Sequence, residues 1–195
     1  LHNPQYTAMV NNRHYQRIAD NLADAHDRGI KTVTINPANE DFSDNPKHKI
    51  APTLIINPDD AATCMQDEIF GPLLPIRTYK HVDEAIAYIN SKPRPLAAYY
   101  FGQDKAEEQR FLTRTTSGGA CINDVMFHML QKDLPFGGVG PSGMGAYHGI
   151  EGFKTFSHAK GVYRQPKRIP VAKLAGLLPP YGSASEKSIQ QKVKK

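Results

Sequence analysis

The sequence lacks long apolar runs. None of its segments reaches the roughly 18 consecutive apolar residues that indicate a membrane-spanning helix. Residues 1–4, Leu-His-Asn-Pro, supply neither the basic region nor the apolar stretch of a signal peptide. We therefore expect no membrane partner and a cytoplasmic location.

Cysteine is also scarce, since the chain has two, Cys64 and Cys121, which stand 57 positions apart. They are too few for a disulfide framework, and their separation excludes the C-x-x-C spacing of a zinc or redox site. As a nucleophile, either thiol would need a nearby base or helix N-terminus, and the sequence shows neither. No two of the eight histidines stand four residues apart, so we expect no metal site.

Acidic residues are nearly missing from the end of the chain. Residues 160–195 carry nine basic side chains and one acidic one, whereas residues 1–159 carry 15 basic and 18 acidic ones. The net charge of +5 therefore comes from a proline-containing tail, which is typical of a solvated extension. We expect no nucleic-acid partner; a nucleic-acid binder that uses this tail is a rival hypothesis, which salt-dependent DNA affinity would test.

Apolar spacing predicts alternating helices and strands. Helices are predicted at 12–28, 82–90 and 104–115, and strands at 32–35, 53–56, 73–78, 97–101 and 120–123. A polar surface loop that includes Pro37, Asp41, Ser43, Asp44 and Pro46 separates the first two strands. The alternation between Leu73 and Asn123 is typical of parallel βαβ units. The predicted fold class is α/β, with a parallel sheet and flanking helices.

The segment from Asp124 to Gly145 has no clear periodic element, and long loops of this kind are often functional. Gly138–Gly143 matches the dinucleotide pattern G-x-G-x-x-G. However, no hydrophobic strand leads directly into it, and Val162 and Tyr163 stand where the acidic partner is expected. We therefore interpret these glycines as a tightly packed loop, which can still form the wall of a pocket.

Asp67–Pro72 places an acid, an aromatic ring and a Gly-Pro turn just before a predicted strand. An ionised carboxylate has two acceptor oxygens and can accept both hydrogen bonds from the cis-diol of a ribose. The residues by themselves favour an ordinary exposed acidic turn, because turns are polar in general.

Two segments of the chain resemble the aldehyde dehydrogenase superfamily. Met65–Pro72 resembles its E-x-F-G-P segment, and Leu134–Gly145 resembles its C-terminal glycine-rich loop. Ala146–Gly149 and Phe153–His158 are similar to the class 3 branch. Within this branch, the insertion at 36–49 and the Leu-Pro-Pro-Tyr-Gly ending at 178–182 look most like bacterial coniferyl aldehyde dehydrogenases. The resemblance extends from about Gln5 to Gly182.

The resemblance implies that the chain is a C-terminal fragment. Family members are more than twice as long and have, upstream, a Rossmann-type cofactor domain and a nucleophilic cysteine in a Gly-Gln-x-Cys context. Here Gly102-Gln103 is followed by Asp104. We therefore expect residues 1–152 to be the C-terminal part of the catalytic domain, 153–165 an extended oligomerisation arm and 166–195 a basic tail. The fragment alone should be inactive, and the intact protein should be a homodimer.

The resemblance also implies roles for individual residues. Three residues match cofactor-binding positions of the family. Glu68 matches the glutamate that holds the nicotinamide ribose, Phe70 matches the ring beside the nicotinamide, and Phe136 matches an aromatic residue that lines the inner pocket near the nicotinamide. Residues 123–128 match a loop near the substrate tunnel. The implied chemistry is oxidation of an aromatic aldehyde, such as coniferyl aldehyde, to its acid with NAD or NADP. A thiolate attacks the aldehyde, hydride is transferred, and water hydrolyses the resulting thioester. A non-catalytic oligomerisation or interaction remnant of such an enzyme is the alternative.

Overall fold

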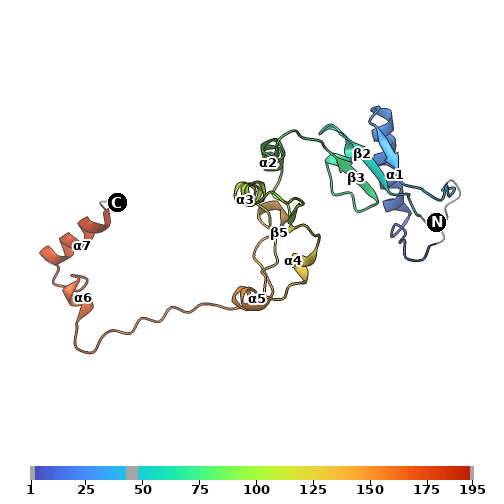
Figure 1. The fold of residues 1–195 in the computed structure, drawn as a ribbon. Coiled ribbons are helices and arrows are strands. Elements are labelled where there is room, and N and C mark those ends of the chain that lie inside the picture. The colour runs from blue at the N-terminus through green and yellow to red at the C-terminus, as the bar shows by residue number, and fades with distance from the viewer. Residues whose placement is uncertain (1–2, 43–47, 194–195) are drawn as a thin grey trace. The chain divides into compact units, whose positions relative to one another are not determined.

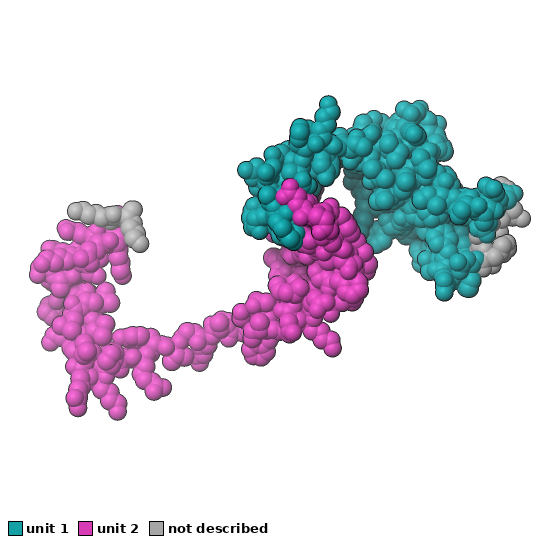
Figure 2. All heavy atoms as spheres, in the orientation of Figure 1, with its two compact units in different colours: residues 1–92, 105–115 teal, residues 93–104, 116–195 magenta. Residues whose placement is uncertain are grey.

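The structure is a computed structural model that describes residues 3–42 and 48–193. It divides into two compact units (Figure 2). Unit 1 comprises Leu1–Lys92 and Lys105–Thr115, and unit 2 comprises Pro93–Asp104 and Thr116–Lys195. We describe each unit by itself.

Unit 1 begins with helix α1 (Asn12–Asp27), which packs against a small sheet (Figure 1). The Asn11 side chain caps the helix by accepting a hydrogen bond from the His14 amide at 3.0 Å. The helix ends at Asp27 with Arg28 as its C-cap residue, and Gly29 follows with a φ of +67°, a left-handed conformation that glycine adopts without steric cost. Ile18 and Ala25 are fully buried, so the predicted apolar face is the face that packs on the core.

The sheet of unit 1 has the order β1-β2-β3. Strand β1 (Thr32–Thr34) pairs antiparallel with β2 (Thr53–Ile56), and β2 pairs parallel with β3 (Leu73–Ile76). The core beneath the sheet also includes η1 (Thr63–Met65). Its buried members are Ile18, Ala25, Ile50, Ile55, Ala62, Cys64 and Leu73. Of the predicted loop between β1 and β2, Ser43, Asp44 and Pro46 lie outside the described residues.

Helices α2 (Val82–Asn90) and α3 (Lys105–Arg114) complete unit 1. They contact each other, and Asp83 of α2 forms ion pairs at 3.4 Å with both Arg110 and Arg114 of α3. The Asn90 amide donates a hydrogen bond to the Arg114 carbonyl at 2.8 Å. These polar contacts fix the ends of the two helices against each other.

Unit 2 contains a second sheet, in which β4 (Ala97–Tyr100) pairs parallel with β5 (Gly119–Ile122). Its described helices after β5 are all short except the last: α4 (Phe127–Leu130), η2 (Gly140–Ser142), α5 (Gly149–Thr155), α6 (Val171–Leu174) and α7 (Ser183–Val193). No helix in the described part of the chain is both long and apolar enough to span a membrane.

The α/β class and the predicted strands and helices before residue 123 are confirmed, but one pairing differs from the expected series of βαβ units. In the described residues β3 pairs with β2, whereas β4 pairs with β5, so β3 and β4 lie in separate sheets. Apolar spacing shows that a strand has a buried face but does not identify its neighbour. The tail also forms helices α6 and α7, which the sequence analysis did not predict.

Candidate functional site

Glu68 and Phe70 lie on the loop between η1 and β3 in unit 1, and both side chains are exposed. The Phe70 ring is 73% exposed. Within the described residues, no hydrogen bond or ion pair reaches the Glu68 carboxylate. The loop therefore presents a carboxylate and an aromatic ring, two residues apart, that are free to contact another molecule.

The backbone of this loop is fixed, although its side chains are exposed. The Arg17 guanidinium of α1 donates to the Glu68 carbonyl at 3.2 Å and also to the Ile69 carbonyl. At the other end, the Thr53 amide of β2 donates to the Pro72 carbonyl at 2.9 Å. Both ends of the segment that carries the ring are thus attached to regular elements of unit 1.

Gly71 packs directly on α1. A Cβ at this position would lie 2.6 Å from Cδ1 and 2.8 Å from Cγ1 of Ile18, a residue that is 0% exposed. Only glycine allows the loop to approach the helix this closely. The preceding residue, Phe70, has a φ of +45°, in the left-handed region that is unfavourable for a residue with a Cβ.

A mostly apolar hollow of about 590 Å³ lies beside the ring. Its lining includes Phe70, Gly71 and Pro72 from the loop and the segment before α1, with the full set being Tyr6, Thr7, Ala8, Met9, Val10, His14, Phe70, Gly71 and Pro72. The ring of Phe70 therefore borders a space large enough for part of a small molecule.

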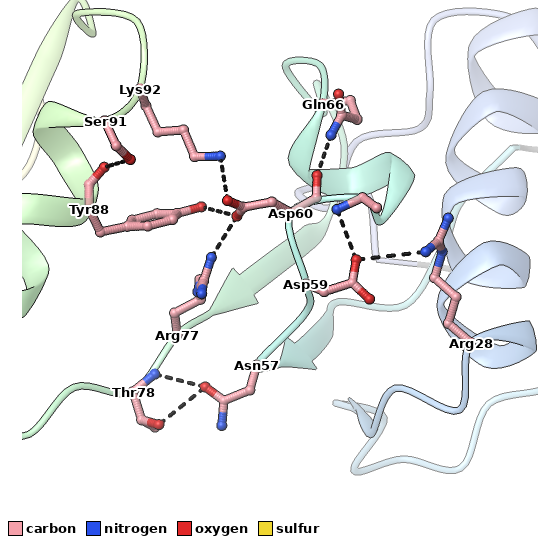
Figure 3. A network of polar contacts seen from close by, with 11 residues as sticks. Arg28, Asn57, Asp59, Asp60, Gln66, Arg77, Thr78, Tyr88, Ser91 and Lys92 are labelled. Carbon is pink, nitrogen blue, oxygen red and sulfur yellow. Dashed lines mark hydrogen bonds and ion pairs between the residues drawn. The ribbon is translucent and has the colours of Figure 1, made fainter.

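A polar network supports the chain just upstream of the loop (Figure 3). The Asp60 carboxylate accepts from Arg77 at 2.6 Å, from the Tyr88 hydroxyl at 2.8 Å and from Lys92 at 2.8 Å. The hydrogen bonds from Lys92 and Tyr88 lower the pKa of Asp60 below its ordinary value of 3.8. The Gln66 amide donates to the Asp60 carbonyl, so this network extends to the residue before Asp67.

A second carboxylate, Asp24 of α1, caps the start of η1. It accepts from the Thr63 amide at 2.8 Å and from the Arg28 guanidinium at 2.8 Å. The backbone hydrogen bond from Thr63 is the main cause that lowers the pKa of Asp24, and the Arg28 side chain adds to it. Helix α1 thus holds the segment before the loop as well as the loop itself.

Phe136 belongs to unit 2, where it lies in a cluster of aromatic rings. Its backbone pairs with Tyr147 through two hydrogen bonds of 2.9 Å, and the two rings meet edge to face at 5.5 Å between centroids. His148 stacks on the Phe136 ring at 6.0 Å, and the buried His128 lies 6.1 Å from it. The position of Phe136 is therefore set by rings on three sides.

The glycine-rich segment is a tight loop and not a strand-to-helix turn. It contains η2, and the Ser142 hydroxyl accepts from the Val139 amide at 2.9 Å. A Cβ on Gly137 would overlap the Gly145 carbonyl, and one on Gly138 would overlap the Ser142 carbonyl. The glycines serve close backbone packing, as predicted from the unsuitable context of the dinucleotide pattern.

Asn123 closes the carboxyl end of the second sheet. Its side chain accepts from the Gly102 amide at 2.8 Å and donates to the Gly102 carbonyl at 2.9 Å. Its φ of +55° is in the left-handed region that asparagine tolerates better than most residues. The expected loop at 123–128 is shorter than predicted, because Phe127 and His128 begin helix α4. Its start is attached through Gly102 to the chain just after β4.

The two thiols show no features of a nucleophile. Cys64 is buried in the core of unit 1, and burial raises the pKa of its thiol. Cys121 lies within strand β5, and both cysteines are free. In the part of the chain that the structure describes, no group of three His, Cys, Asp or Glu side chains could hold a metal ion.

The structure thus brings Glu68 and Phe70 together on one loop, and it places Phe136 in the other unit. Arg17 was not predicted from the sequence; its contacts to the loop join residues 51 and 52 positions apart. The only local sign of its role is that it is a basic residue next to the buried Ile18 on an amphipathic helix. The link between Asn123 and Gly102 was not predicted either.

Comparisons with known proteins place these elements in context. A model of the aldehyde dehydrogenase family matches residues 2–162. A coniferyl aldehyde dehydrogenase from a Pseudomonas species is 52% identical over 94% of this chain and 38% of its own length. A substrate-bound structure of Staphylococcus aureus AldH has a TM-score of 0.71 at 37% identity, covering 96% of this chain and 38% of that one.

A further solved structure, a mutant of aldehyde dehydrogenase C from Pseudomonas syringae in complex with NAD+ and octanal, has a TM-score of 0.65. It is 26% identical and covers 76% of this chain and 30% of that one. The chain therefore spans about two fifths or less of the length of these relatives.

Proposed function

Since the chain belongs to the aldehyde dehydrogenase family, we propose that it is the C-terminal part of an NAD(P)-dependent enzyme that oxidises an aldehyde to its carboxylic acid. The family is NAD(P)-dependent. Similarity to a coniferyl aldehyde dehydrogenase supports an aromatic substrate of the coniferyl type.

The observation that carries this proposal is the loop that presents Glu68 and Phe70 on a fixed backbone. The Glu68 carboxylate has two acceptor oxygens without partners among the described residues, which suits the two hydroxyls of a ribose. The exposed Phe70 ring, beside an apolar hollow, suits the face of a flat heterocycle. These residues therefore fit a nicotinamide riboside, and the cofactor, when bound, supplies the acceptor for the hydride.

We assign the remaining residues to the inner pocket near the nicotinamide and to the path of the aldehyde. Phe136, held by Tyr147 and His148, forms an aromatic wall of the inner pocket. The 123–128 loop, fixed at Asn123, borders the path of the substrate. Aromatic walls bind an aromatic aldehyde through stacking and exclusion of water.

The nucleophile is a cysteine in another part of the enzyme. Burial raises the pKa of the Cys64 thiol, which disfavours the thiolate that nucleophilic catalysis needs. Cys121 is a residue of strand β5, and we assign the nucleophile to neither cysteine. The contribution of this chain is to position the cofactor and substrate, and it does not oxidise aldehydes by itself.

We also propose that the arm at 153–165 mediates a homodimer of the complete enzyme. Its residues beyond α5 form no regular element, and large apolar side chains on it are highly exposed: Phe156 (89%), Val162 (74%) and Tyr163 (73%). Side chains of this kind are commonly covered by a partner.

The proposed role of Glu68 is tested by Glu68→Gln in the complete enzyme, with Asp67→Asn as the matched control on the same loop. The glutamine loses one acceptor oxygen and the negative charge, so the nicotinamide is held less accurately. We expect single-turnover formation of NAD(P)H from an aromatic aldehyde to slow by about tenfold to a hundredfold, because misplacement of about 1 Å has effects of this size. Asp67→Asn should change the single-turnover rate little. Unchanged single-turnover kinetics in Glu68→Gln would contradict the assigned role.

A further inference from the structure

We propose that Arg17 is a positioning residue for the loop between η1 and β3. By binding the backbone of this loop, Arg17 holds the Glu68 carboxylate in place. The inference rests on the proposed function of Glu68. It adds to it a residue on a different element, 51 positions earlier in the chain.

The first observation is that one guanidinium binds two successive carbonyls. Arg17 donates to the carbonyl of Glu68 through Nη1, at 3.2 Å, and to that of Ile69 through Nη2. Among the described residues these carbonyls are the polar partners of the Arg17 side chain. The Glu68 carbonyl belongs to the peptide unit directly after Glu68 and the Ile69 carbonyl to the next one, so the guanidinium fixes the orientation of the backbone from which the carboxylate extends.

The second observation is that Arg17 extends from a well-packed helix. Arg17 precedes Ile18, which is fully buried against the sheet, and the side chain of Arg17 is half-buried. Helix α1 is 16 residues long and capped by Asn11. The guanidinium therefore attaches the backbone of the loop to helix α1.

The third observation is the strained backbone of the next residue. Phe70 has a φ of +45°, and a left-handed conformation at a residue with a Cβ persists only when the surroundings hold it. Arg17 holds the segment before Phe70, and the packing of Gly71 on Ile18 holds the segment after it. Without Arg17 only one side is held, and the loop can relax with both the ring and the carboxylate displaced.

The geometry requires arginine and not merely a positive charge. A guanidinium is a planar fork that reaches two acceptors at once, whereas a lysine ammonium is a point charge on a flexible stem. Arg17→Lys should therefore lose most of the positioning of the loop, even though it keeps the positive charge.

The test uses the complete enzyme with Arg17→Ala and Arg17→Lys. The control is Arg13→Ala, which removes an exposed arginine one turn earlier on the same helix. We expect both Arg17 variants to slow single-turnover hydride transfer by about tenfold to a hundredfold and to weaken NAD(P)+ binding, because the loop is misplaced. Millimolar guanidinium ion should restore part of the rate in Arg17→Ala and none in Arg13→Ala. A loss of general stability would not be rescued in this way.

A double variant separates the failure of this inference from that of the proposed function. If Arg17 acts through Glu68, the effect of Arg17→Ala should largely vanish in a Glu68→Gln background. Additive effects, or an Arg17→Ala enzyme with unchanged hydride transfer, would overturn the positioning role while leaving the role of Glu68 intact. If Glu68→Gln itself has no effect, the proposed function of the loop fails first.

Discussion

The contact between Gly71 and Ile18 gives a prediction whose magnitude follows from the structure. In Gly71→Ala, the new methyl group would lie 2.6 Å from Cδ1 and 2.8 Å from Cγ1 of Ile18, well inside van der Waals distance. Ile18 is fully buried in the core, so any shift of its side chain disturbs the residues packed around it. Overpacking of this kind costs about 1–3 kcal/mol. No strain from φ contributes, since Gly71 is not among the residues with a positive φ.

Native-state hydrogen exchange in the complete enzyme would measure this cost locally. The Thr53 amide, which donates to the Pro72 carbonyl, should exchange about 5- to 150-fold faster, the ratio that corresponds to 1–3 kcal/mol. Adding Ile18→Val removes Cδ1, the nearest atom, so the double variant should recover part of the protection. Gly182→Ala is the control, because a Cβ there meets nothing within 4 Å and the residue lies outside the proposed dimer arm. If Gly71→Ala exchanges like Gly182→Ala, the proposed packing of the loop on α1 is wrong.

The remaining predictions concern Asp60 and the two thiols. Because the pKa of Asp60 is lowered in the folded state, its stabilising effect is present above the ordinary value of 3.8 and is lost as the pH falls through the lowered pKa. Asp60→Asn should therefore lower the Tm of the complete enzyme at pH 6, and the difference from wild type should shrink below pH 4; a constant difference would contradict the role of the carboxylate. Cys64→Ala and Cys121→Ala should each leave the turnover of the complete enzyme within about threefold of wild type, since removal of a true nucleophile costs orders of magnitude. Abolished turnover in either variant would refute the assignment.

Much of the fold was predictable from local patterns. The spacing of Tyr15, Ile18, Leu22 and Ala25 predicted α1, because one face of a helix must be apolar to pack on a core. Strands β1 and β2 were predicted from short β-branched runs for a similar reason. The pairing of the strands was not predictable, because an apolar run carries no information about which strand lies beside it. In the structure the parallel partner of β3 is β2.

The residues of the candidate loop could be identified from the sequence, but the contacts that fix the backbone of this loop could not. Glu68 and Phe70 stand in one short segment, so the sequence alone placed them side by side. The contact from Arg17 depends on how α1 packs beside the loop, and the left-handed φ of Phe70 contradicts its residue type. Both features arise from tertiary structure and leave no local pattern.

The close backbone packing around the glycine-rich loop limits how this part of the enzyme can diversify. A Cβ on Gly118 would strike the carbonyls of both Gly137 and Leu96, and main-chain atoms cannot rotate aside as side chains do. Random mutagenesis aimed at these glycines should therefore yield mostly insoluble protein. A library intended to broaden the range of aldehydes accepted by the proposed enzyme is better directed at the segment that leads into α4, where Val125, Met126 and Phe127 are about half exposed.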